Sequence, residues 1–180
     1  MDRKIMVKGE RLKVIGIVLC AMLFLCLTGC KQHDWLDWKT QNELWLEANK
    51  SQPGVKTTES GLQYKIIADP TPQDAVPNST STVVCDYTLR LINGCEIETA
   101  NTASLYLPNM IPGFIEGCHK IHNNGDIEMY IPAYLGYDAD KYDSGTYDEA
   151  EGNGTEGGTF FIPPYSTLIF TVHICAVSGN

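Results

Sequence analysis

The sequence predicts an α+β fold, built mainly from antiparallel β-strands with one short helix among them and an amphipathic helix in front. Two observations lead to this prediction. Several runs alternate between apolar and polar residues, which is the period of a strand, whereas two stretches repeat their apolar residues at helical spacing. The pair Asn93-Gly94 joins two of the alternating runs and favours a tight hairpin. Consecutive hairpin-connected strands around a single helix indicate the α+β class.

Residues 1–29 have the pattern of an export signal. A basic start precedes an almost wholly apolar stretch over 14–27, and Thr28-Gly29-Cys30 follows. That stretch is shorter than the roughly 20 residues of a membrane-spanning helix, which argues against an uncleaved anchor. The small residues before Cys30 resemble a bacterial lipobox, which implies cleavage before Cys30 and lipidation of its thiol and new amino group. An ordinary secretory signal is the alternative interpretation.

The first elements of the mature chain are a helix and a strand. Apolar residues, three tryptophans among them, recur near helical spacing over 34–49, which predicts an amphipathic helix that packs on the main domain. Pro53-Gly54 ends this helix. Residues 60–67, SGLQYKII, are expected to form the first strand, and the proline-rich segment 68–81 a loop.

The rest of the chain alternates strands with one helix. Residues 82–98 form the expected hairpin, and the apolar residues of 114–121 lie at the spacing of a single short helix. DIEMYIPA, residues 126–133, is the next strand. Residues 138–158 are an acidic insertion, and 166–172 the last strand, with Leu168, Phe170 and Val172 on one face.

Length and charge limit the possible partners. Cleavage before Cys30 leaves 151 residues, which suits a lipidated tether and helix over 30–57 followed by one domain over 58–180. Residues 1–29 hold five of the 13 basic and two of the 22 acidic residues, so the mature chain has a net charge of −12. This charge disfavours nucleic acid and offers no basic attraction to anionic lipid. Membrane attachment would then depend on the lipid alone.

No metal or cofactor is expected. Four cysteines remain after the signal, namely Cys85, Cys95, Cys118 and Cys175. Their spacing contains no CxxC pair and supports neither a zinc site nor a thioredoxin-type motif. Export permits disulfides, but the sequence does not reveal a pairing. His119 and His122 lack further ligands nearby, and the acidic insertion fits no EF-hand pattern, so both are expected to be solvated surface features.

Five segments, in order, resemble the FKBP family of peptidyl-prolyl cis-trans isomerases. They are SGLQYKII, DYTLRLINGCEIE, MIPGFIEG, YIPAYLGY and FIPPYSTLIFTV, and the resemblance covers about residues 58–177. It implies a curved antiparallel sheet that wraps around the short helix and leaves an apolar hollow between them. It also implies proline-containing polypeptides as clients.

The resemblance assigns residues to that hollow. The catalytic set it implies is Tyr87, Glu98, Phe114, Tyr137 and Phe170, and the substrate-binding set is Ile97, Met110, Ile111 and Ile162. The backbone N–H of Ile111 is expected to meet a substrate carbonyl. Pro163-Pro164 is expected to hold a rim loop rigid, so that Ile162 overhangs the hollow and Phe170 returns into it.

The implied chemistry needs no nucleophile. Rotation about an X-Pro bond crosses a barrier of roughly 20 kcal/mol. The twisted bond has lost amide resonance and is less polarised than the planar one, so an apolar cleft can bind it more tightly and lower the barrier. We expect the protein to act as a folding helper in the bacterial envelope, anchored through Cys30 and facing the periplasm or the cell surface.

Several residues depart from the family pattern. Phe114 replaces a tryptophan, Ile97 a phenylalanine and Glu98 an aspartate, while Ala103 and Leu105 lie where aromatic residues are expected. A less aromatic hollow would bind proline more loosely. One alternative is therefore a peptide-binding lipoprotein of the same fold without useful turnover. Another is a structural envelope component that docks through its tryptophan-rich helix.

Overall fold

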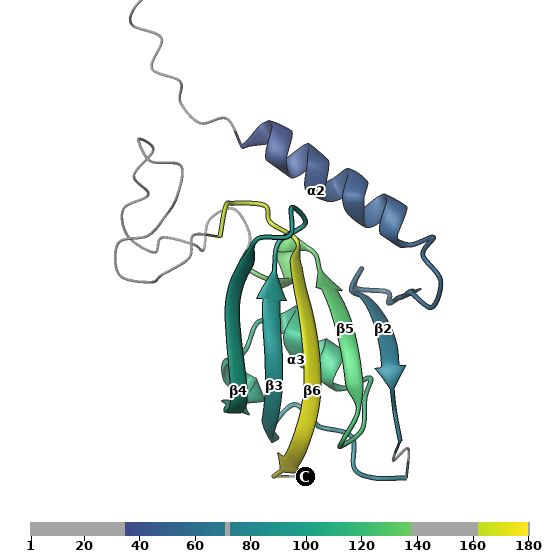
Figure 1. Ribbon diagram of the computed structural model, residues 1–180, viewed down its shortest axis with the longest axis vertical. Coiled ribbons are helices and arrows are strands. Elements are labelled where there is room, and N and C mark those ends of the chain that lie inside the picture. Colours follow the sequence, from purple (N-terminus) through teal and green to yellow (C-terminus); the bar gives the residue numbers. More distant parts are fainter. Residues whose placement is uncertain (1–34, 71–72, 138–161, 180) are drawn as a thin grey trace, which may run out of the picture. The chain divides into compact units, whose positions relative to one another are not determined.

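Figure 1 shows the computed structural model, which describes residues 35–70, 73–137 and 162–179. The described elements, in chain order, are α2 (Leu36–Asn49), β1 (Lys56–Thr57), β2 (Gln63–Ala68), β3 (Thr82–Arg90), β4 (Glu96–Tyr106), η1 (Leu107–Asn109), α3 (Pro112–Cys118), β5 (Asp126–Ile131), η2 (Ala133–Leu135) and β6 (Leu168–Ser178). The strands form one antiparallel sheet in the order β1-β2-β5-β6-β3-β4. The predicted α+β class is confirmed.

The hairpin predicted around Asn93-Gly94 is formed by β3 and β4. Its turn places Gly94 at a φ of +83°, in the left-handed region that glycine adopts without steric cost. The Asn93 side-chain oxygen accepts the backbone N–H of Cys95 at 3.0 Å, which is how asparagine favours turns. The strand after the turn reaches Tyr106, eight residues beyond the predicted end of the hairpin.

The last strand begins two residues later than predicted and extends further. Thr167 precedes β6, which runs from Leu168 to Ser178 between β5 and β3. Leu168, Phe170 and Val172 are all buried, as the alternation predicted. A long strand in the middle of the sheet therefore carries Phe170 into the core.

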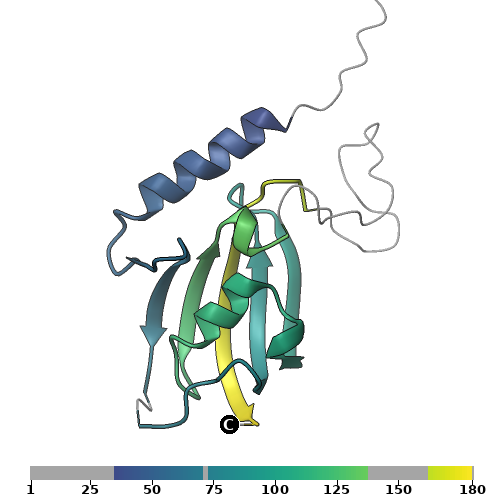
Figure 2. The same cartoon turned by 180° about the vertical axis from the view of Figure 1, so that it is seen from behind.

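The short helix α3 lies against one face of the sheet (Figure 2). It begins at Pro112, whose fixed φ suits the first helical position and whose missing N–H would have no partner there. Two helix glycines let it approach β5 closely. A Cβ on Gly113 would lie 2.3 Å from Ile131, and one on Gly117 would lie 2.2 Å from the Met129 sulfur. Glycine at these two positions therefore determines how closely α3 packs against β5.

The predicted N-terminal helix is present as α2 and packs on the main domain through Trp38, which contacts the core, and Trp45, whose ring lies 5.7 Å from that of Tyr130. Its apolar pattern nevertheless describes its inward face only in part. Leu36 and Leu44 are 60% and 66% exposed, whereas Asn42 and Asn49 are buried. The expectation of a simple amphipathic helix was wrong in this respect. Hydrogen bonds replace apolar packing at part of the contact, since both asparagine side chains bond to the main domain.

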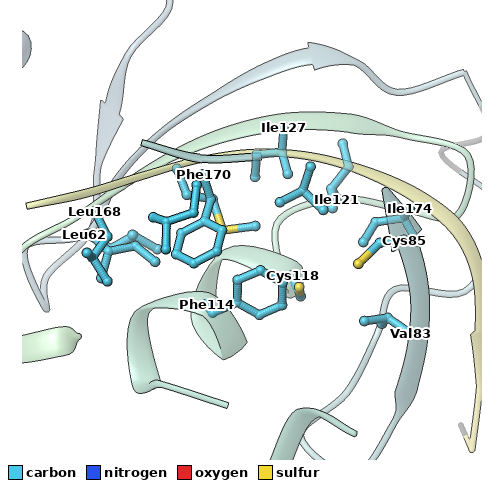
Figure 3. Packing of buried hydrophobic residues seen from close by; sticks show 14 of the residues in the cluster. Leu62, Val83, Cys85, Phe114, Cys118, Ile121, Ile127, Leu168, Phe170 and Ile174 are labelled. Atoms are coloured by element: carbon cyan, nitrogen blue, oxygen red, sulfur yellow. The ribbon is translucent and has the colours of Figure 1, made fainter. Parts of the chain in front are cut away.

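The core lies between the sheet and α3 (Figure 3). Phe114, Cys118 and Ile121 from the α3 region meet residues of β3, β5 and β6 there, and all three are fully buried. The four described cysteines are free thiols, of which Cys85 and Cys118 are buried and Cys95 is exposed. The two buried thiols thus behave as small apolar side chains.

Thiol reactivity should follow this burial. Burial raises the pKa of the Cys85 thiol from 9.0 to about 12, and it raises the pKa of Cys118 as well. At neutral pH the fraction of Cys85 thiolate is then roughly a thousandfold below that of an ordinary thiol. We expect iodoacetamide to alkylate Cys95 in the native protein and to spare Cys85 and Cys118 until urea is added. Peptide mass spectrometry measures this, and equal labelling of all three in the native state would contradict it.

Three predictions concern residues outside the described part of the chain. These are the signal over 1–29, lipidation at Cys30 and the acidic insertion over 138–158. Within residues 35–70, 73–137 and 162–179, no helix has the length and apolar character needed to cross a membrane.

Candidate active site

Three aromatic side chains from separate elements meet on the helix-facing side of the sheet. The ring centroids of Phe114 and Phe170 lie 5.2 Å apart with planes at 70°, an edge-to-face contact (Figure 3). The Tyr87 ring lies 6.0 Å from that of Phe170. Phe114 is fully buried and Phe170 is 4% exposed, whereas Tyr87 is half-buried. The cluster therefore has a closed end at Phe114 and a more open end at Tyr87.

Strand register explains why Tyr87 and Phe170 meet. In the β3–β6 pair, Tyr87 lies opposite Val172 and Leu89 lies opposite Phe170. Tyr87 and Phe170 are thus diagonal neighbours on one face, within reach of two aromatic rings. Phe114 joins them because α3 crosses the same face.

A hydrogen bond orients the Tyr87 phenol. Its hydroxyl donates to the Glu98 carboxylate at 2.7 Å across the β3–β4 pair. Burial is the main cause that raises the pKa of the Tyr87 phenol above its ordinary value of 10, and the hydrogen bond to Glu98 and the negative charge of Glu98 raise it further. The phenol therefore stays protonated and can donate at physiological pH.

The residues of the predicted substrate-binding set belong to the hydrophobic core or border it. Ile97 and Ile162 are buried at 8% and 4% exposure. Met110 and Ile111 are partly buried and pack against this core, as does Tyr137 of the predicted catalytic set. Eight of the nine predicted site residues thus belong to the hydrophobic core or pack against it, and Glu98 bonds to Tyr87. Ring contacts join three of them, Tyr87, Phe114 and Phe170, and a hollow shared by all nine stays a prediction.

Ile111 caps the start of α3 with an extended backbone, at φ −64° and ψ 147°. Its carbonyl accepts the N–H groups of Phe114 and Ile115. Among the hydrogen bonds between described residues, none uses the Ile111 N–H. This donor is therefore available to an acceptor such as a substrate carbonyl.

The sequence interpretation missed a bulge beside Tyr87. Cys85 pairs with Ala103 and Tyr87 with Ala100, so Asp86 faces two residues of β4 instead of one. The Asp86 carboxylate accepts the N–H of Thr102 at 2.6 Å, and Thr102 has a φ of +54°. The signal that could have revealed it is the small polar pair Asn101-Thr102 within an otherwise strand-like run.

Leu105 lies further along β4 and packs against the core, whereas Ala103 is half-buried. The missing aromatic residues thus leave aliphatic surface on this side of the cluster.

A separate open groove of about 450 Å³ is lined by none of the predicted site residues. Its lining consists of Trp38, Gln41, Leu44, Trp45, Ile92 and Asn93.

Neither histidine of the 119–122 pair belongs to a metal site in the described chain. His122 pairs through Nδ1 with the Asp69 carboxylate at 2.9 Å. Across the described ranges, no group of three or more His, Cys, Asp or Glu side chains could hold a metal ion.

Alkaline unfolding should report the environment of Tyr87. The folded protein keeps the phenol proton above about pH 10, where the unfolded chain releases it. This contribution to stability is therefore complete below about pH 10 and is lost as the pH rises toward the raised folded-state pKa. In urea titrations from pH 8 to 11, Tyr87→Phe should show a shallower loss of stability above pH 10 than the unaltered protein. Equal slopes would contradict the burial of this phenol.

Comparisons with known proteins agree with this architecture. Residues 73–175 match the family described as FKBP-type peptidyl-prolyl cis-trans isomerase, and residues 31–66 match the domain amino-terminal to it. The crystal structure of FkpA from Escherichia coli superposes with a TM-score of 0.66 at 26% identity, covering 99% of this chain and 73% of that one.

Two curated relatives are similar in sequence. The outer membrane protein MIP of Legionella longbeachae is 33% identical over 77% of this chain and 54% of its own length. The FKBP-type 22 kDa peptidyl-prolyl cis-trans isomerase of Escherichia coli is 31% identical over 74% of this chain and 58% of its own. The chain spans about half the length of the curated relatives it matches. With the family match over more than half of the chain and the same sheet-and-helix fold, this protein belongs to the FKBP-type peptidyl-prolyl cis-trans isomerases.

Proposed function

We propose that the protein is an active peptidyl-prolyl cis-trans isomerase that uses the aromatic cluster as its proline pocket. Two observations support this proposal: Tyr87, Phe114 and Phe170 meet through their rings, and the Ile111 N–H at the start of α3, the helix that carries Phe114, is available. The aromatic rings can pack against the proline ring of a substrate, and the Ile111 N–H can donate a hydrogen bond to the carbonyl of a neighbouring substrate residue. The site can thus hold the substrate at two points around the rotating bond.

Catalysis follows from the polarity of the cluster. A planar X-Pro amide is polarised by resonance, so it loses favourable solvation when it enters an apolar site. The twisted amide has lost this resonance and is less polar, so its desolvation costs less. Preferential binding of the twisted form lowers the barrier, and each ~1.4 kcal/mol of preference gives a tenfold rate increase. In this scheme Tyr87 and Tyr137 supply phenol groups at the edge of an otherwise apolar surface.

An isomerisation assay with a Leu-Pro peptide and the purified full chain tests the proposal. We expect catalysis, and Tyr87→Phe should lower kcat/KM about three- to tenfold, the effect of one lost hydrogen bond. Tyr106→Phe is the matched control, since it changes a half-exposed tyrosine at the end of β4 and should leave kcat/KM unchanged. Peptide binding without catalysis would instead favour the binding-module alternative.

We also propose that residues 1–29 are an export signal and that Cys30 carries the lipid anchor, with a tether and helix over 30–57 and the catalytic domain over 58–180. The basic and apolar pattern before Cys30 supports this, and one relative is named an outer membrane protein. Its clients would be proline-containing polypeptides of the bacterial envelope. Labelled palmitate should enter the expressed protein and not Cys30→Ala, whereas equal incorporation would contradict lipidation at this cysteine.

A further inference from the structure

The helix α2 holds the segment 162–167, which links Ile162 of the proposed pocket to β6. The Asn42 side-chain oxygen accepts the backbone N–H of Thr167 at 2.7 Å. Asn42 is 2% exposed and Thr167 is 1% exposed, so water does not compete for this bond. The Asn42 amide group donates to the carbonyl of Trp38 at 2.8 Å, which fixes its orientation.

A second connection runs from Trp38 toward Ile162. The Trp38 indole N–H donates to the Ser166 hydroxyl at 3.0 Å. That hydroxyl donates in turn to the carbonyl of Pro163 at 2.6 Å. The relay from α2 therefore ends one residue away from Ile162, which is itself buried in the core cluster.

The held segment contains a strained residue. Tyr165 has a φ of +62°, a left-handed conformation that is unfavourable for a bulky side chain. Such a conformation persists when surrounding contacts leave no alternative. Lys39 of α2 supplies one such contact, with its ammonium 5.0 Å from the centroid of the Tyr165 ring.

We propose that Asn42 and Trp38 are positioning residues of the isomerase, acting through Thr167 and Ser166 on Ile162 and Phe170. This inference rests on the proposed pocket. Phe170 follows Thr167 by three residues, so the point where Asn42 holds the chain also sets where β6 enters the cluster. The N-terminal helix is then part of the working site, and without it the segment would spend only part of its time in the binding-competent arrangement.

A change in the fraction of molecules whose 162–167 segment is in the binding-competent arrangement would alter KM and kcat differently. When the competent arrangement is occupied only part of the time, the apparent affinity for substrate falls by that fraction. Asn42→Leu and Ser166→Ala should therefore raise KM about three- to tenfold, while kcat changes less than about twofold. Each variant removes one of the two connections to the segment.

Asn49→Leu provides the matched control. Asn49 is a second buried asparagine of α2, and it bonds to Gln63 on β2 and not to the 162–167 segment. Its loss should lower stability through the lost Gln63 bond and leave the bonds of Asn42 and Trp38 in place, so KM should stay within about twofold of the original value. The assay uses the full chain and a Leu-Pro peptide, at a temperature where circular dichroism shows every variant folded. Equal rises in KM for Asn42→Leu and Asn49→Leu would overturn the proposal.

A spectroscopic measurement separates this inference from the proposed activity. In the 15N-labelled full chain, the Leu-Pro peptide should shift the Trp38 indole N–H resonance, and Ser166→Ala should remove most of that shift. This readout needs peptide binding and not turnover. Binding with no catalysis would therefore refute the isomerase proposal alone, whereas binding with an unmoved Trp38 resonance, or no binding at all, would refute the positioning role.

Discussion

Phe170→Ala is expected to lower the free energy of unfolding by about 3–5 kcal/mol, the range for removing a buried aromatic ring. Phe170 is 4% exposed and packs edge-to-face on Phe114. It also lies in β6, in the middle of the sheet, where β5 and β3 restrict collapse around the new cavity. Urea unfolding followed by circular dichroism measures the loss.

Phe170→Leu separates the proposed pocket role of this ring from its packing role. Leucine keeps much of the apolar volume, so stability should fall far less than with alanine. The ring contacts to Phe114 and Tyr87 are lost, and kcat/KM toward a Leu-Pro peptide should fall about tenfold, or ~1.4 kcal/mol. Ile169→Ala, on the opposite face of the strand, should leave kcat/KM unchanged. If Phe170→Leu retained full activity, Phe170 would be a packing residue only.

Gln63→Leu is expected to cost about 1–3 kcal/mol, because it leaves the buried Asn49 amide without its partner and removes one of the two bonds to the Leu46 carbonyl, which keeps the bond from the Lys50 N–H. The Gln63 amide donates to the carbonyl of Leu46 at 2.9 Å and accepts from the Asn49 side chain at the same distance. Gln63 is 1% exposed and Asn49 is 7% exposed, so water does not readily replace either bond. Thermal and urea unfolding should both show the loss.

The double variant Asn49→Leu/Gln63→Leu should recover part of this loss. Replacing both partners by apolar residues of similar size removes the unpaired Asn49 donor, and the Leu46 carbonyl keeps its bond from the Lys50 N–H. We expect the double variant to be more stable than Gln63→Leu alone. If the two losses simply added, the cost would come from packing and not from unsatisfied polar groups.

The sequence predicted the elements better than it predicted their junctions. Asn93-Gly94 located the β3–β4 turn, and the alternation of β6 identified the buried face that carries Phe170. Both signals are local, since a dipeptide conformation and a period of two residues do not depend on distant parts of the chain. The bulge at Asp86 was not predicted, because it depends on a side chain that reaches across to Thr102 on another strand.

The contact between α2 and the main domain shows the same limit. Helical spacing predicted a helix over nearly the observed residues, yet its inward face includes Asn42 and Asn49 and leaves Leu44 exposed. An apolar pattern identifies the buried face only where packing is apolar. At this junction, hydrogen bonds to Thr167 and Gln63 decide which residues face inward.

The sequence by itself determined the class of fold and the order of its elements, because periodicity and turn chemistry depend on residues close together in the chain. The tertiary structure alone decided which residues meet. Tyr87 is a diagonal neighbour of Phe170, and Phe114 contacts the Phe170 ring edge-to-face. Asn42 of α2 accepts a hydrogen bond from Thr167, 125 residues further along the chain. Such contacts depend on strand register and on helix depth. Both are set by the whole packed molecule, through close approaches such as that of Gly113 to β5.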